Sequence, residues 1–129
     1  MHVLLIEPDK LLAASYAAAL ERSGHTVAHA VSAQGAVHQA DTAMPDVVVL
    51  ELQLPNHNGV EFLYEFRSYN EWLGIPVVLH TFVPDRELTH AAALGRELGV
   101  VRILYKPETK NPARVLIGCH LAAAWICHK

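Results

Sequence analysis

Short runs of apolar, mostly β-branched residues recur along the chain, with room for one helix between each run and the next. The runs are Val3 to Ile6, Thr26 to Ala30 (the weakest), Val47 to Leu50, Val77 to Leu79 and Val101 to Leu104. None alternates cleanly between apolar and polar residues, which is typical of strands covered on both faces. Strict alternation of strand and helix predicts a parallel sheet with helices on both faces, joined by right-handed crossovers.

The segments between these runs place apolar residues on one face at helical spacing. The faces consist of Leu12, Tyr16, Ala19 and Leu20; Ala33, Ala36, Val37 and Ala40; Phe62, Leu63 and Phe66; and Leu88, Ala91, Ala92 and Gly95. Boundary residues agree: Gly24 ends the first helix, Ser32 caps the second, Asp85 opens the fourth and Pro112 suits the first turn of the last. We therefore expect one α/β domain over residues 1–129, a three-layer, doubly wound, five-stranded parallel sheet in the order 2-1-3-4-5.

Composition limits the environment and the partners of such a domain. The chain is 52% hydrophobic, but its apolar runs are far shorter than the roughly 20 residues of a membrane span. Its net charge is −3 and its 10 basic residues are scattered, which argues against direct nucleic-acid binding. The start of the chain lacks a signal-peptide pattern, and Cys119 and Cys127 lie too far apart in one helix for a disulfide. We therefore expect a cytoplasmic protein with reduced cysteines.

Polar residues gather where the predicted strands end. Glu7 and Asp9 follow the first strand, Glu51 the third, Thr81 the fourth and Lys106 the fifth. In a doubly wound sheet, the binding crevice lies beyond the carboxyl ends of the strands where the winding reverses. Acids from two strands would face a hydroxyl and a lysine there, so the sequence predicts a compact polar pocket.

Four motifs carry these residues: VLLIEPD, PDVVVLELQLPNHNG, IPVVLHT and LYKP. Together they resemble the receiver domain of two-component response regulators, of the chemotaxis-regulator type with a flavodoxin-like (βα)5 fold, over essentially the whole chain. The resemblance implies phosphoryl transfer to an aspartate after the third strand. It implies Mg²⁺ held by that aspartate, by an acidic pair after the first strand and by a carbonyl two residues past the acceptor. Thr81 and Lys106 match the residues that bind the phosphoryl oxygens in that family, and Pro55 and Gly59 match its loop.

The sequence departs from the family pattern at residues that matter for the chemistry. Glu51 stands at the phosphoacceptor position, Pro8 replaces the second acid, Asp9 falls one position late, and Ile103 replaces the aromatic switch residue. The extra methylene of Glu51 moves its carboxylate by roughly 1.3 to 1.5 Å, which in-line transfer and octahedral Mg²⁺ coordination tolerate poorly. We therefore expect an atypical, or pseudo-, receiver that is not phosphorylated in the usual way, needs no cofactor and lacks the usual rotameric switch.

Several details of the pocket stay open at this point. Glu51 would hold a negative charge beside Lys106, either as a mimic of the activated state or only as a structural partner. His80 could face the pocket or the sheet, and the nine histidines include no pair at the spacing of a transition-metal site. Weak Mg²⁺ binding remains an option at four residues: Glu7, Asp9, Glu51 and Gln53.

Three functions compete. The leading hypothesis is a protein-interaction module that signals through its fold and surface and is not an enzyme. The first alternative is a conventional receiver that accepts a phosphoryl group on Glu51 or Asp9 with Mg²⁺, for which the resemblance implies a sensor kinase as partner. The alternative of another class is a small-ligand-binding or enzymatic α/β domain that uses the crevice at the strand ends.

The last predicted helix, Val115 to Cys127, is apolar on nearly every side. One stripe holds Val115, Cys119, Ala122 and Ile126, and the other holds Ile117, Leu121 and Trp125. Only one stripe can face the sheet, so the other is exposed unless Trp125 folds back or a following domain covers it. The resemblance implies that helix 4, strand 5 and helix 5 form the usual contact face. We therefore expect Ile117, Leu121 and Trp125 to contact a partner protein, an effector domain or a second copy.

Overall fold

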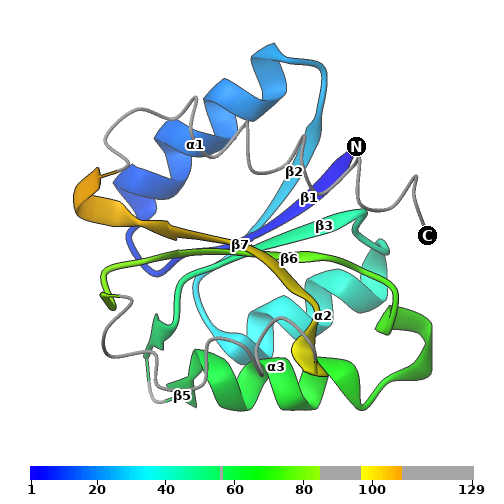
Figure 1. Ribbon diagram of the computed structural model, residues 1–129. Helices are drawn as coiled ribbons and strands as arrows, with labels where there is room; N and C mark the ends of the chain where they lie inside the picture. The colour runs from blue at the N-terminus through cyan, green and yellow to red at the C-terminus, as the bar shows by residue number, and fades with distance from the viewer. Residues whose placement is uncertain (56, 85–96, 109–129) are drawn as a thin grey trace.

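The computed structural model describes residues 1–55, 57–84 and 97–108, and in them a five-stranded parallel sheet is the central layer (Figure 1). Its spatial order is β2-β1-β3-β6-β7, which confirms the predicted doubly wound order. The strands are β1 His2–Ile6, β2 Thr26–Ala30, β3 Val47–Leu50, β6 Val77–Thr81 and β7 Val100–Tyr105. Neighbouring strands pair in parallel throughout this sheet, so all five carboxyl ends lie at one edge of the layer.

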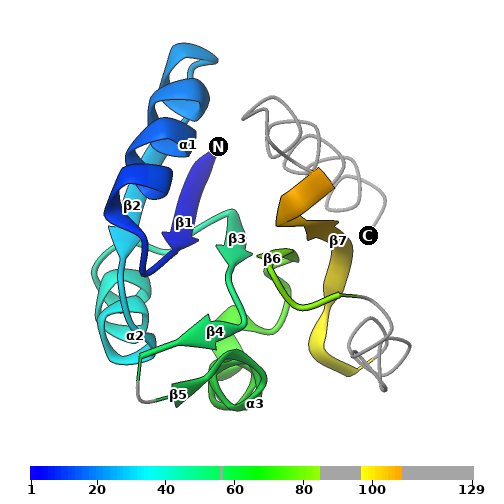
Figure 2. The same ribbon diagram turned by 90° about the vertical axis from the view of Figure 1, so that its left-hand side faces the viewer.

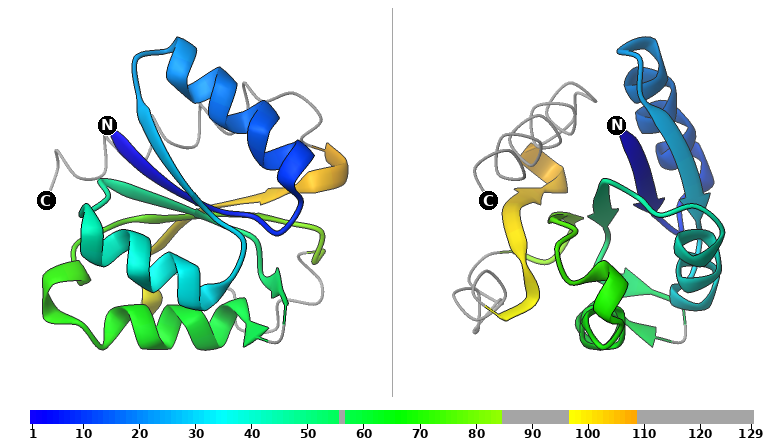
Figure 3. Two further views of the ribbon diagram at one scale, coloured as in Figure 1. Left: turned by 180° about the vertical axis from the view of Figure 1, so that it is seen from behind. Right: turned by 90° about the vertical axis from the view of Figure 1, so that its right-hand side faces the viewer.

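Helices cover both faces of the sheet. The helix α1 (Lys10–Arg22) packs on one face, while α2 (Ala33–Thr42) and α3 (Gly59–Arg67) lie side by side on the other (Figures 2 and 3). The predicted boundaries are confirmed at Ser32, whose hydroxyl accepts a hydrogen bond from the backbone N–H of Gly35 at 3.1 Å. They are also confirmed at Gly24, whose φ of 89° turns the chain after α1.

The sheet has a separate apolar core on each face, because side chains alternate between the two faces along each strand. On β1, Leu4 and Ile6 pack with α2 and α3, whereas Val3 and Leu5 pack with α1. Because successive side chains of a strand point to opposite faces, a strand buried on both sides must be apolar at every position. This accounts for the uninterrupted apolar runs in the sequence and confirms the three layers.

Four short elements in the described residues have no counterpart in the sequence prediction. The strands β4 (Gln53–Leu54) and β5 (His57–Asn58) form a small antiparallel pair after β3, and the 3₁₀ helices η1 (Asn70–Trp72) and η3 (Lys106–Glu108) follow α3 and β7, respectively. Gly59, the first residue of α3, packs against the backbone of Leu52. A Cβ added at Gly59 would lie 2.6 Å from the Cα of Leu52. Segments of two or three residues carry no periodicity, so pattern analysis does not detect them.

Two predicted helices lie outside the described residues. They are the fourth helix, which carries Leu88, and the last helix, with Ile117, Leu121, Trp125 and both cysteines. Among the helices in the described part of the chain, none is long and apolar enough to cross a membrane.

Candidate functional site

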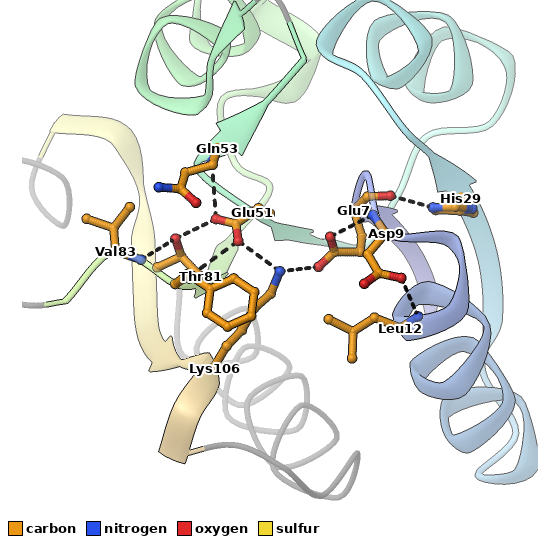
Figure 4. Close-up of polar contacts among 10 residues, drawn as sticks. Glu7, Asp9, Leu12, His29, Glu51, Gln53, Thr81, Val83 and Lys106 are labelled. Atoms are coloured by element: carbon orange, nitrogen blue, oxygen red, sulfur yellow. Dashed lines mark hydrogen bonds and ion pairs between the residues drawn. The ribbon is translucent and has the colours of Figure 1, made fainter.

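Four polar side chains meet at the carboxyl edge of the sheet, where its winding reverses between β1 and β3 (Figure 4). Glu7 follows β1, Glu51 follows β3, Thr81 ends β6 and Lys106 follows β7. Their exposed fractions are 2%, 3%, 0% and 6%, respectively. The structure therefore brings these four predicted residues into one buried cluster, as the parallel arrangement of the strands requires.

Lys106 links the two acids of the cluster. Its Nζ lies 2.5 Å from Glu7 Oε1 and 2.8 Å from Glu51 Oε1. The sequence predicted a negative charge at Glu51 beside Lys106, but it did not predict that one ammonium bridges two carboxylates. The bridge offsets the cost of burying these charges, because each ion has an opposite charge within contact distance.

Both oxygens of the Glu51 carboxylate are occupied by donors. Oε2 accepts hydrogen bonds from Thr81 Oγ1 at 2.5 Å and from the backbone N–H of Gln53 at 3.1 Å. Oε1 accepts from Lys106 at 2.8 Å and from the backbone N–H of Phe82 at 3.3 Å. Burial raises the pKa of Glu51, but hydrogen bonds from Lys106, Thr81 and Gln53 outweigh burial and leave this pKa below its ordinary value.

The acidic segment after β1 contributes one carboxylate to the cluster. Glu7 Oε2 accepts from the backbone N–H of Asp9 at 3.1 Å, and the Glu7 carbonyl accepts from His29 Nε2 at 2.8 Å. The exposed Asp9 side chain instead caps α1, where it accepts from the N–H of Leu12 at 3.0 Å (Figure 4). The expectation that Asp9 joins the pocket therefore needs correction, because the first turn of α1 holds its carboxylate.

The structure also describes Gln53, Ile103 and His80, which the sequence singled out. The backbone N–H of Gln53 contacts Glu51, while Ile103 packs against the core beneath α2 and α3. His80 faces α1, where its ring meets Tyr16 edge to face at 4.6 Å. Burial first, and then the charge of Lys106, lowers the pKa of His80 to about 4, so its imidazole is neutral at pH 7. His80 therefore belongs to the packing of the sheet and not to the pocket.

Phe82 is a member of the site that sequence reasoning missed. Its ring lies over the Lys106 ammonium, with 4.7 Å between Nζ and the ring centroid, and its N–H contacts Glu51. The only signal in the sequence is an aromatic residue directly after the strand-end Thr81.

The residues at this edge do not fit the Mg²⁺ that the resemblance implies. A Mg²⁺ site needs near-octahedral oxygen ligands, but Lys106 Nζ holds the place between Glu7 and Glu51. Pro8 offers no side-chain ligand, and the Asp9 carboxylate lies on α1. Within residues 1–55, 57–84 and 97–108, no three His, Cys, Asp or Glu side chains are grouped to hold a metal ion.

Comparison with known proteins places the chain among signalling proteins. Residues 3–116 match the family model of the response regulator receiver domain. The KDP operon transcriptional regulatory protein KdpE of Escherichia coli K12 is 32% identical over 125 residues, which cover 94% of this chain and 53% of KdpE. The alkaline phosphatase synthesis transcriptional regulatory protein PhoP of Bacillus subtilis 168 is 30% identical over 105 residues, covering 81% of this chain and 42% of PhoP. The chain thus spans about half the length of these relatives or less.

Solved structures agree on the fold. The crystal structure of a CheY-like response regulator receiver domain protein from Methanospirillum hungatei JF-1 matches with a TM-score of 0.82 at 18% identity, covering 97% of this chain and 94% of that one. At this low identity, the match establishes a shared fold.

Proposed function

The chain belongs to the response regulator receiver domain family, and from this membership we propose that it is an atypical receiver that signals without the usual phosphorylation. In two-component signalling it acts as a protein-interaction module. One observation carries the proposal: the Glu51 carboxylate takes up the donors that a phosphoryl group would need, namely Thr81 Oγ1 and Lys106 Nζ.

Charge balance supports the same conclusion. Glu7 and Glu51 carry two negative charges in the cluster, and Lys106 supplies one positive charge. Phosphorylation of Glu51 would replace its single negative charge with roughly 1.5 to 2 negative charges at neutral pH. With Mg²⁺ unsupported by the ligand set, Lys106 would have to balance this larger charge together with Glu7, which is unfavourable in a buried cluster.

Of the two roles open for Glu51, the geometry favours the structural one. Its carboxylate has one charge and two oxygens, whereas a phosphoryl group has nearly two charges and three terminal oxygens. Each oxygen of Glu51 is already hydrogen-bonded twice. Glu51 therefore anchors Lys106 and Thr81 in one arrangement and does not act as a variable signal.

The test is a titration with Mg²⁺, with and without the phosphoryl mimic beryllofluoride, followed by amide NMR at residues 7, 9, 51, 81 and 106. We expect no saturable change in the amide chemical shifts at millimolar Mg²⁺, whether or not beryllofluoride is present. Saturable shifts that disappear in Glu51→Gln would support the conventional alternative with Glu51 as acceptor. Shifts that persist in Glu51→Gln but disappear in Asp9→Asn would support the alternative with Asp9.

Partner contacts complete the proposal. A sensor kinase, an effector domain or a second copy binds the face formed by the predicted fourth helix, by β7 and by the last predicted helix. Its expected contact residues, Ile117, Leu121 and Trp125, lie outside the described residues, so this assignment rests on the sequence pattern alone. The cytoplasmic location expected from the sequence is part of the same proposal. No observation in the described residues favours a ligand-binding or enzymatic domain.

A further inference from the structure

The surroundings of the Lys106 ammonium leave it little room for another ligand. An ammonium group has three N–H donors. Carboxylate oxygens of Glu7 and Glu51 lie 2.5 and 2.8 Å from Nζ and account for two of them. The third described neighbour is the face of the Phe82 ring, 4.7 Å from Nζ at its centroid, a distance typical of a cation–π contact.

Hydrogen bonds hold the backbone around Phe82 close to the cluster. The Phe82 N–H donates to Glu51 Oε1 at 3.3 Å, and the next N–H, of Val83, donates to Thr81 Oγ1 at 3.1 Å. Both bonds tie the segment after β6 to the cluster itself. The ring is 54% exposed, whereas Lys106 beneath it is only 6% exposed. The ring is therefore an outer layer between the ammonium and the solvent.

We propose that Phe82 is a gate residue whose ring closes the Lys106 site to water and to small oxyanions such as phosphate. This inference rests on the proposed function, because it concerns the same pocket, but it assigns a second barrier that does not depend on Glu51. An oxyanion that approaches Lys106 must first displace the ring from the ammonium. Replacing Glu51 alone therefore leaves the site partly closed.

The size of this effect follows from the exposure of the ring. Cation–π contacts at exposed positions correspond to about a 2- to 5-fold change in an equilibrium constant. The gate is thus weak enough for the ring to rotate away, and it is expected to slow and weaken the entry of an anion without abolishing it. A measurable but moderate difference between variants is the signature to look for.

The first experiment measures exchange of the Lys106 ammonium protons with water by ¹⁵N NMR. In the unaltered chain these protons are expected to exchange slowly, because Lys106 is buried and paired. Phe82→Ala should speed their exchange by about 2- to 5-fold or more, whereas Phe82→Tyr should retain slow exchange. Tyr64→Ala is the matched control, because it removes an aromatic ring that is 58% exposed on α3, away from the site. Equal exchange rates in Phe82→Ala and the unaltered chain would overturn the gate.

The second experiment titrates inorganic phosphate into Glu7→Gln/Glu51→Ala and into the same variant with Phe82→Ala added, with circular dichroism to verify folding. The first two substitutions free the donors of Thr81, Lys106, Gln53 and Phe82 and leave the charge of Lys106 for the anion. We expect Glu7→Gln/Glu51→Ala to bind phosphate and the triple variant to bind it about 2- to 5-fold more tightly. Equal affinities would overturn the gate and leave the proposed function standing. No binding in either folded variant would count against the proposed function, and the exchange rates would still decide the gate.

Discussion

At the scale of single residues, the cluster depends on a shared cation. Lys106 neutralises Glu7 and Glu51 together, and the side chains of all three are 3% to 4% exposed. Such a bridge does not by itself make a protein more stable than an apolar core would, because desolvation opposes the attraction. Removing the Lys106 ammonium, by contrast, is destabilising, since it leaves the two buried carboxylates of Glu7 and Glu51 without a counter-charge.

We expect Lys106→Met to lower the free energy of unfolding by about 3 to 5 kcal/mol, the usual cost of leaving a buried charge unpaired. Urea denaturation at pH 7 measures this change. Lys10→Met is the control, because Lys10 is exposed at the start of α1. A loss no larger than in the control would mean that the cluster is more hydrated than its burial indicates.

The buried imidazole of His80 makes stability depend on pH. Burial lowers the pKa of His80 from 6.5 to about 4, so between these values the unfolded chain binds a proton that the folded chain does not. The free energy of unfolding should therefore fall as the pH drops from about 6.5 to 4, by roughly 3 kcal/mol from this group.

His80→Phe keeps an aromatic ring against Tyr16 and should flatten that part of the stability curve. Chemical denaturation at a series of pH values between 4 and 7 gives the measurement. His38→Gln removes an exposed histidine of α2 and serves as the control. An unchanged slope in His80→Phe would show that other groups cause the acid sensitivity.

At the scale of elements, one half-buried arginine joins three segments. Arg67, the last residue of α3, donates from Nε to the Leu98 carbonyl at 2.9 Å and from Nη1 to the Trp72 carbonyl at 2.5 Å. Its Nη2 donates to the Ile75 carbonyl at 2.5 Å. The planar fork of the guanidinium thus joins the end of α3 to the segments before β6 and β7.

Arg67→Lys should destabilise the fold by about 1 to 3 kcal/mol, because an ammonium cannot reach all of these carbonyls and partly buried acceptors lose their donors. Thermal or urea unfolding tests this expectation. Arg102→Lys, at an exposed position of β7, provides the comparison for an arginine without such a role. If both variants were equally stable, the carbonyls would have to be satisfied by water.

At the scale of the whole molecule, the two faces of the sheet bury separate cores, and the site lies where the winding reverses between them. This architecture gathers the buried polar cluster at one edge of the sheet. The sequence places the strongest remaining apolar surface on the last predicted helix.

We expect Trp125→Glu to abolish self-association of the chain, because a charge in an apolar interface is costly to bury. Sedimentation velocity over a range of protein concentrations tests this expectation. Leu11→Glu is the control, because Leu11 is 86% exposed on α1 and lies outside the expected contact face. A chain that stays monomeric at all concentrations would contradict the dimer and leave a partner protein as the occupant.

Sequence patterns alone predicted the five strands of the main sheet, the first three helices, the sheet order and the polar residues at the strand ends. Apolar periodicity and helix boundaries are local properties, and parallel strands must end at one edge of the sheet, so Glu7, Glu51, Thr81 and Lys106 could be placed together without coordinates.

How those side chains contact one another depends on the tertiary structure. The bridge from Lys106 to Glu7, the Phe82 ring over the ammonium and the packing of His80 on Tyr16 join residues far apart in the chain. The Asp9 carboxylate does not join the predicted pocket, because it accepts a hydrogen bond from the first turn of α1. Contacts of this kind depend on side-chain rotamers and on competition between neighbouring donors, and neither is encoded in a periodic pattern.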